Sequence, residues 1–218
     1  MNISFSRIVI VSAIVAVCIV PLYAHHGTQF LTKAIELNAM EVQMGQLADM
    51  KSQNSNVKGY AQMLVRDHTE SLTKANDLLN ARQASAGAAG KPAQTTNNAA
   101  DVKMSPEHQR LYDRLSSLSG ADFDREFMNA MVNGHREAIQ MFEVQSRAHG
   151  NRISSNQTGM PMNQQTARQK PTAPDQHKYS RAELRRDADT AQFANDTLPT
   201  LRNHLQQAES IQKQLQGK

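Results

Sequence analysis

The chain has 218 residues, of which 39% are hydrophobic, 5% aromatic and 20% charged, and its formal net charge is +4. This hydrophobic share is below the usual ~45–50%, so a large core can form only if polar segments are excluded from it. The only cysteine, Cys18, lies close to the N-terminus. If that segment is removed, a disulfide framework, a cysteine-ligated metal site and a cysteine nucleophile are all excluded.

Residues 1–24 are predicted to be a signal peptide. Arg7 supplies the positive start, Ile8–Val20 form an apolar run, and Ala24 offers a small residue for cleavage. The run is shorter than the ~20 residues that a membrane span needs, which makes an uncleaved anchor the less favoured alternative. We therefore expect cleavage near Ala24 and a mature protein, residues 25–218, that is periplasmic or secreted.

The mature chain is predicted to be all-α. Apolar residues recur at alternating spacings of three and four, which places them on one face of a helix. β-Branched alternation is absent, so strands are not expected. Ser105-Pro106-Glu107 indicates a capped start for a short extra helix, 106–117, before the third long one. The four long helices are expected at residues 28–52, 55–83, 121–149 and 181–216.

Two polar stretches separate these helices. Residues 84–103 have almost no large apolar side chain, and residues 150–180 are rich in Asn, Gln, Pro, Ser and Thr. Neither can bury enough apolar area to offset its loss of conformational entropy, so both are predicted to be flexible linkers. The first turn is so short that the first two helices must be antiparallel neighbours. A four-helix bundle is expected, with the topology of its second half left open.

One polar residue lies near the middle of the apolar face of each long helix. These residues are Glu41, His68, His135 and His204. Glu41, His68 and His135 lie about 13 or 14 residues after the predicted starts of their helices, so at 1.5 Å rise per residue their depths agree to about one turn, and His204 lies toward the middle of the fourth helix. Antiparallel helices of similar length would bring them to the same level of the bundle, so a carboxylate and three imidazoles are expected to converge there.

Two interpretations of this polar layer compete. Imidazole with carboxylate suits a transition metal such as copper, zinc or iron, and Met44, Met128 and Met131 on the same faces favour copper. Alternatively, the four groups hydrogen-bond to one another or to water and fix the helix register. Histidines that face solvent are a third possibility.

Other charged residues are not expected to act in a site. Asp67 is rotated by ~100° from His68 along an ideal helix, which places it on the surface with Arg66. Glu137 and Glu143 are expected to face outward as well. No G-x-S-x-G, glycine-rich phosphate loop or H-E-x-x-H motif is present, so nothing supports a hydrolase or a kinase.

The helical segments resemble a bacterial family of exported proteins, domain-of-unknown-function family 4142. The stretches that carry the resemblance are Glu36-x4-Glu41-Val42-x2-Gly45, Ala61-x-Met63-Leu64-Val65-x-Asp67-His68, Phe123-Asp124-x-Glu126-Phe127-x3-Met131-Val132-x2-His135 and Thr197-Leu198-Pro199-x-Leu201-x2-His204. The resemblance implies a ferritin-like four-helix bundle without an assigned activity. Di-iron bundles carry a Glu three residues before each of two histidines, but this chain has Val65 and Val132 there, so their chemistry is not carried over.

The favoured function is therefore a non-enzymatic exported bundle of unassigned role, with binding of a transition metal through the mid-bundle layer left open as one option. The alternative is an envelope-associated interaction or stress-related module with a purely structural layer. In that case the basic residues at the start of the fourth helix could meet an anionic envelope surface. Nucleic acid is not expected as a partner. A metal-dependent redox enzyme would need an open coordination position and a pocket, which the sequence does not reveal. The basic residues are Lys178, Arg181, Arg185 and Arg186.

Overall fold

The computed structural model describes residues 24–85, 96–157 and 181–217. Most of the predicted signal peptide, parts of both predicted linkers and the basic residue Lys178 lie outside the described residues. The described chain contains five α-helices and one 3-10 turn and no sheet, which confirms the all-α prediction. The elements are α1 (Ala24–Lys51), α2 (Ser55–Ser85), η1 (Ala99–Asp101), α3 (Pro106–Ser117), α4 (Gly120–Gln157) and α5 (Arg181–Gln216).

The helix boundaries follow the sequence signals closely. Ser105 caps α3 by accepting a hydrogen bond from the backbone of His108, with Pro106 in the first turn, as predicted. α3 and α5 have the predicted bounds. α4 continues to Gln157, into the stretch predicted as the second linker, because no proline interrupts the chain before Pro161.

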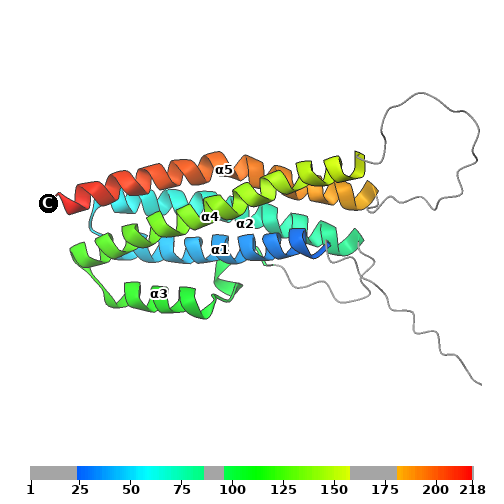
Figure 1. The fold of residues 1–218 in the computed structure, drawn as a ribbon. Coiled ribbons are helices and arrows are strands. Elements are labelled where there is room, and N and C mark those ends of the chain that lie inside the picture. The colour runs from blue at the N-terminus through cyan, green and yellow to red at the C-terminus, as the bar shows by residue number, and fades with distance from the viewer. Residues whose placement is uncertain (1–23, 86–95, 158–180, 218) are drawn as a thin grey trace, which may run out of the picture.

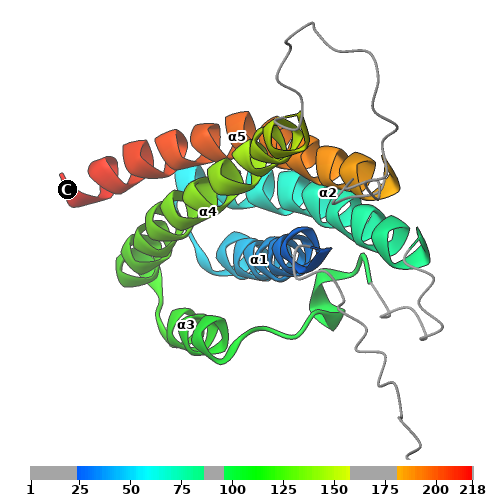
Figure 2. The same cartoon turned by 45° about the vertical axis from the view of Figure 1, so that its right-hand side comes forward.

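The long helices form two antiparallel pairs. α1 packs along α2, and α4 packs along α5, while α2 contacts α5 and α1 contacts α4. Because α2 and α4 run in the same direction, the chain between them must return along the molecule (Figure 1). It does so on the outside, where η1 packs on α1 and α3 lies along α1 and α4 (Figure 2).

Part of the first predicted linker is held against the helices, contrary to the expectation that all of residues 84–103 are flexible. The side-chain amide of Gln43 on α1 donates to the backbone carbonyl of Ala99 over 2.7 Å. The amide of Asn76 on α2 donates to the carbonyl of Thr96 over 2.8 Å. The side-chain amides of Gln43 and Asn76 therefore hold a segment that has few apolar side chains of its own. These hydrogen bonds come from distant residues, so the composition of the segment does not reveal them.

Two apolar clusters fill the two ends of the molecule. In one, the rings of Phe30, Phe142 and Phe193 meet edge-on or tilted, with centroids 5.0–6.3 Å apart. The other gathers around Phe123 and Phe127. On α2, α4 and α5 a histidine lies between the residues that belong to the two clusters, so the polar layer separates two hydrophobic cores.

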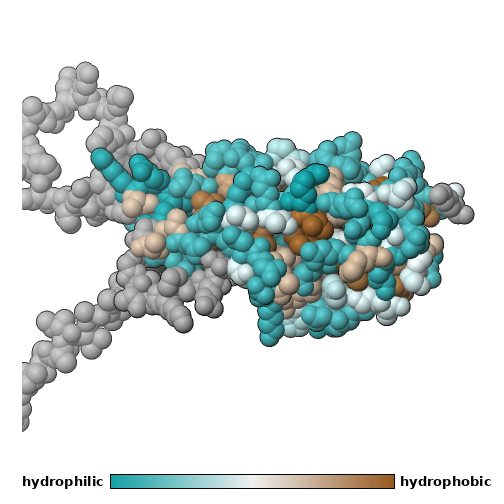
Figure 3. Space-filling view, turned by 180° about the vertical axis from the view of Figure 1, so that it is seen from behind, coloured by the Kyte–Doolittle hydropathy of each residue, from teal (hydrophilic) through white to brown (hydrophobic). Residues whose placement is uncertain are grey.

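The outer surface is mostly polar. The face seen from behind is mainly hydrophilic, with hydrophobic residues gathered in a few small areas (Figure 3). Among the described helices, none combines the length and the apolar character that a membrane crossing requires. Arg181 and Arg185 are exposed at the start of α5, in agreement with their predicted position on the surface.

Candidate metal centre

Three buried histidines from three helices meet in the polar layer. His68 on α2, His135 on α4 and His204 on α5 have side chains that are nearly inaccessible to solvent. Their ring centroids are 5.2–5.6 Å apart. One nitrogen of each ring can be chosen so that all three lie within 4.8 Å of one another. We call these residues the histidine triad; three of the four groups that were expected to converge at this level do come together.

The position of the proton on His135 follows from its backbone partner. His135 Nδ1 lies 2.9 Å from the carbonyl oxygen of Met131, one turn earlier in α4. Because a carbonyl oxygen only accepts hydrogen bonds, Nδ1 must carry the hydrogen. The other nitrogen, Nε2, therefore presents its lone pair to the triad.

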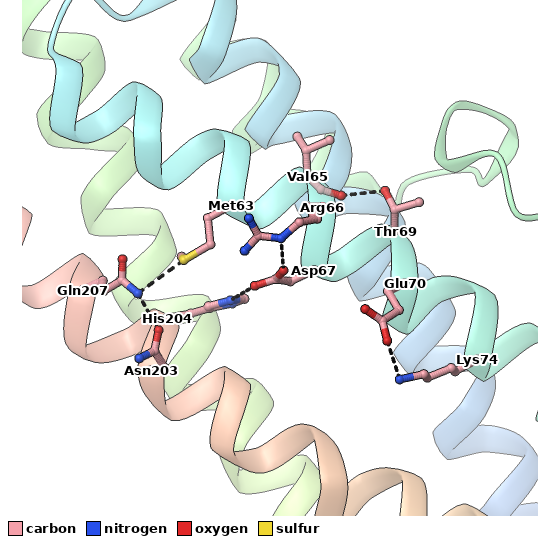
Figure 4. A network of polar contacts seen from close by, with 10 residues as sticks. All are labelled: Met63, Val65, Arg66, Asp67, Thr69, Glu70, Lys74, Asn203, His204 and Gln207. Carbon is pink, nitrogen blue, oxygen red and sulfur yellow. Dashed lines mark hydrogen bonds and ion pairs between the residues drawn. The ribbon is translucent and has the colours of Figure 1, made fainter.

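His204 is fixed in the opposite tautomer by a carboxylate. Its Nε2 lies 3.0 Å from Asp67 Oδ2, and Arg66 donates to Asp67 Oδ1 over 2.7 Å, so that Asp67 on α2 points toward α5 (Figure 4). Burial alone would raise the pKa of Asp67, but the hydrogen bonds from Arg66 and His204 outweigh it and lower the pKa. An ionised carboxylate accepts only, so His204 Nε2 donates and Nδ1 keeps its lone pair.

The third histidine is oriented by an asparagine. Asn38 Nδ2 donates to the carbonyl of Ala34 over 2.7 Å, which leaves Asn38 Oδ1 facing His68 Nδ1 at 2.9 Å. An amide oxygen accepts, so His68 Nδ1 carries the hydrogen. His68 Nε2 is buried and has no hydrogen-bond partner among the described residues.

The facing nitrogens of His135 and His204 have no proton between them. His135 Nε2 and His204 Nδ1 are 3.3 Å apart, although the outer contacts give both atoms the acceptor role. Burial lowers the pKa of all three histidines, to about 4 for His135 and well below the usual value for His68. The rings are therefore neutral at pH 7, which is the form of imidazole that binds metals.

Glu41 lies beside the triad rather than within it. Its Oε1 is 3.9 Å from His135 Nδ1, the nitrogen that faces away from His204, and Oε2 is buried without a partner among the described residues. Burial raises the pKa of Glu41 to about 8. Of the four residues predicted to form the layer, three come together and the fourth flanks them.

Sequence reasoning missed Asn38 and Asp67. Asp67 does pair with Arg66, as expected, but it also contacts His204. A residue rotated by ~100° from an inward-facing histidine lies at the edge of the interface, where a neighbouring helix can reach it. The adjacency of Asp67 and His68 was the available signal. For Asn38 the signal was a polar residue one turn before Glu41 on the same helix.

A cavity of about 360 Å³ reaches the triad from the side of α1 and α4. Its inner end is formed by Asn38, Glu41, His68 and His135, whereas His204 is not among its lining residues. The exposed residues Lys33, Glu107 and Glu137 surround the outer end, together with the largely buried His108 from α3. The remaining walls are largely apolar and include Leu37, Met40, Ala138, Met141, Phe142 and Leu201.

Comparison with known proteins gives one match. The model of the family described as domain of unknown function (DUF4142) matches residues 20–153. This range covers α1 to most of α4, with Glu41, His68 and His135, and stops before α5 and His204. Neither curated proteins nor solved structures give a match to the chain.

Proposed function

Because the chain belongs to the DUF4142 family, whose description assigns no activity, we propose its function from the geometry of the triad: it binds one transition-metal ion through His68, His135 and His204. The observation that carries this proposal is the convergence of three buried imidazoles, in which His135 Nε2 faces His204 Nδ1 with no proton to share and His68 Nε2 has no hydrogen-bond partner among the described residues. A metal cation is the partner to which three imidazole lone pairs can be donated at once.

The separation of two of the ring nitrogens agrees with a metal site. Zinc–imidazole bonds are about 2.0–2.1 Å long, and two ligands at a tetrahedral angle are then about 3.3–3.4 Å apart. His135 Nε2 and His204 Nδ1 are separated by 3.3 Å. This pair is thus spaced for coordination, and a nitrogen of His68 lies within 4.8 Å of both.

The outer contacts have the form that metal ligands require. Metal-bound histidines donate their second N–H to a carboxylate, a carbonyl or water, which fixes the tautomer and the orientation of the ring. Here Asp67, the Met131 carbonyl and Asn38 each receive such a hydrogen bond. Every triad ring is held by an oxygen acceptor on its outer side.

A purely structural polar layer is less consistent with this geometry. Such a layer gains stability when each donor meets an acceptor, and a buried acceptor without a donor is costly. In this protein the acceptors face acceptors, and His68 Nε2 lacks a partner in the part of the chain that the structure describes. The alternative of an envelope-associated module with a structural layer therefore has less support.

Neutral imidazoles suit zinc, copper, iron and nickel, so the ligand set alone does not choose among the predicted metals. We propose binding rather than catalysis as the role of the ion, because the sequence carries none of the hydrolase or kinase motifs. We further propose that the protein is exported, on the evidence of residues 1–24, and that its fold is a ferritin-like four-helix bundle. The two antiparallel pairs, with α2 and α4 running in the same direction, support that fold.

Metal analysis of protein purified without a histidine tag tests the proposal. The wild type, supplied with Zn²⁺ or Cu⁺ and freed of excess, should retain about one ion per chain, as expected for three protein ligands to one metal. His68→Ala and His135→Ala should lose it. His108→Ala is the matched control, because His108 lies on α3 outside the triad. Substoichiometric metal in the wild type, or equal loading in all four proteins, would contradict the proposal.

A further inference from the structure

We propose that the cavity beside the triad is a chamber for a small molecule that carries a nitrogen donor on a compact apolar ring, and that this donor completes the coordination of the metal. This inference rests on the metal binding proposed above. The molecule belongs to the class of azoles and similar neutral heterocycles.

The cavity meets the triad where a metal would be open. His68 and His135 form part of its inner end, while His204 lies outside its lining, held by Asp67 between α2 and α5. Three protein ligands leave the fourth position of a tetrahedral ion free. An ion bound among the three rings is therefore reached from the cavity side.

The size of the cavity limits what can enter. Small-molecule sites usually measure ~300–1,000 Å³, and this cavity has about 360 Å³. A molecule of one or two rings fits, whereas a haem or a dinucleotide does not. The outer end opens between α1, α3 and α4, where Lys33, Glu107 and Glu137 are exposed.

The walls define the chemistry of the ligand. Met141, Phe142 and Leu201 give the cavity apolar sides, which favour an uncharged ring. At the inner end, Glu41 Oε2 is buried and has no hydrogen-bond partner among the described residues. A heterocycle with a second nitrogen carries an N–H group that can supply the hydrogen bond this carboxyl oxygen lacks. Apolar walls with an unsatisfied carboxyl oxygen at the inner end, near the proposed metal position, thus point to an azole.

Cobalt provides the readout, because the visible absorption of Co²⁺ reports its ligands. The Co²⁺-loaded, untagged protein would be titrated with azide, imidazole and 4-phenylimidazole. All three should change the spectrum. 4-Phenylimidazole should bind about ten-fold or more tightly than imidazole, because its phenyl ring is transferred from water to the apolar walls.

Variants that fill the cavity locate the binding site. Ala138→Leu on α4 and Thr197→Leu on α5 enlarge two lining residues that come from different helices. Each should weaken 4-phenylimidazole about ten-fold or more by steric exclusion, while azide, which needs little space, should bind within about two-fold of the wild type. Ala182→Leu is the matched control, since Ala182 is exposed on α5 and does not line the cavity.

The outcomes separate this inference from the metal proposal. If Co²⁺ binds to the triad but no probe changes its spectrum, the chamber is refuted and metal binding stands. If the filling variants bind 4-phenylimidazole as tightly as Ala182→Leu does, the ligand site is elsewhere and the chamber is again refuted. If Co²⁺ does not bind to the wild type, both proposals fail.

Discussion

Replacing Glu41 by glutamine should change how the stability of the metal-free protein depends on pH. Burial raises the pKa of Glu41 from 4.5 to about 8 in the folded protein. Between these values the folded state binds more protons than the unfolded state, so the contribution of Glu41 to stability falls as the pH rises. Glutamine has nearly the same shape and does not titrate, so Glu41→Gln removes this dependence.

The magnitude follows from the pKa of about 8. Each unit of pKa difference corresponds to about 1.4 kcal/mol, and between about pH 6.5 and 8.5 the Glu41 contribution falls by about 2 kcal/mol. The buried histidines have lowered pKa values, and their contribution rises with pH, mostly below pH ~6.5. Their effect is common to both proteins, so it cancels in the difference between wild type and variant.

Urea unfolding followed by circular dichroism, in the presence of a chelator, would measure this difference. Relative to Glu41→Gln, the wild type should lose about 2 kcal/mol of unfolding free energy across that interval. A difference that stays constant with pH would show that Glu41 is ionised at neutral pH or is not buried beside His135, and would refute the reasoning.

Three further predictions concern the buried Arg82–Asp187 ion pair, the glycine packed against it and the carboxylate that contacts His204. Arg82 and Asp187 form an ion pair of 2.9 Å with both side chains 8% exposed. Arg82→Met should therefore lower the free energy of unfolding in urea by about 3–5 kcal/mol. Lys74→Met, which removes an exposed ion pair with Glu70, is the control and should lower it by less than about 1 kcal/mol. A Cβ added at Gly27 would lie 2.5 Å from the Arg82 guanidinium, so Gly27→Ala should lower the unfolding free energy by about 1–3 kcal/mol; no loss would mean that the guanidinium can move aside. Asp67→Ala should weaken metal binding about 10–100-fold in a chelator competition. Asp77→Ala, which replaces an exposed residue on the same helix, should leave the metal affinity unaltered. If the two variants bind the metal with equal affinity, Asp67 does not support the site.

The histidine triad illustrates what pattern and spacing can predict. The helix period places His68, His135 and His204 on the apolar faces, and their positions toward the middle of their helices place them near one level. Both properties are local, so they survive in the folded protein: the rings lie 5.2–5.6 Å apart. Glu41 shares the level but not the point of convergence, because depth along a helix does not specify which neighbour a side chain approaches.

The sequence by itself determined the helices, the bounds of α3 and α5, and the mid-bundle level of the histidines, because capping and amphipathic period act over a few residues. Only the tertiary structure decided that α2 and α4 run in the same direction, that η1 and α3 return along α1, and that Asp67 reaches His204. These features arise from contacts between distant segments. The tautomers of His68 and His204 also depend on contacts with distant residues, whereas that of His135 depends on the local carbonyl of Met131.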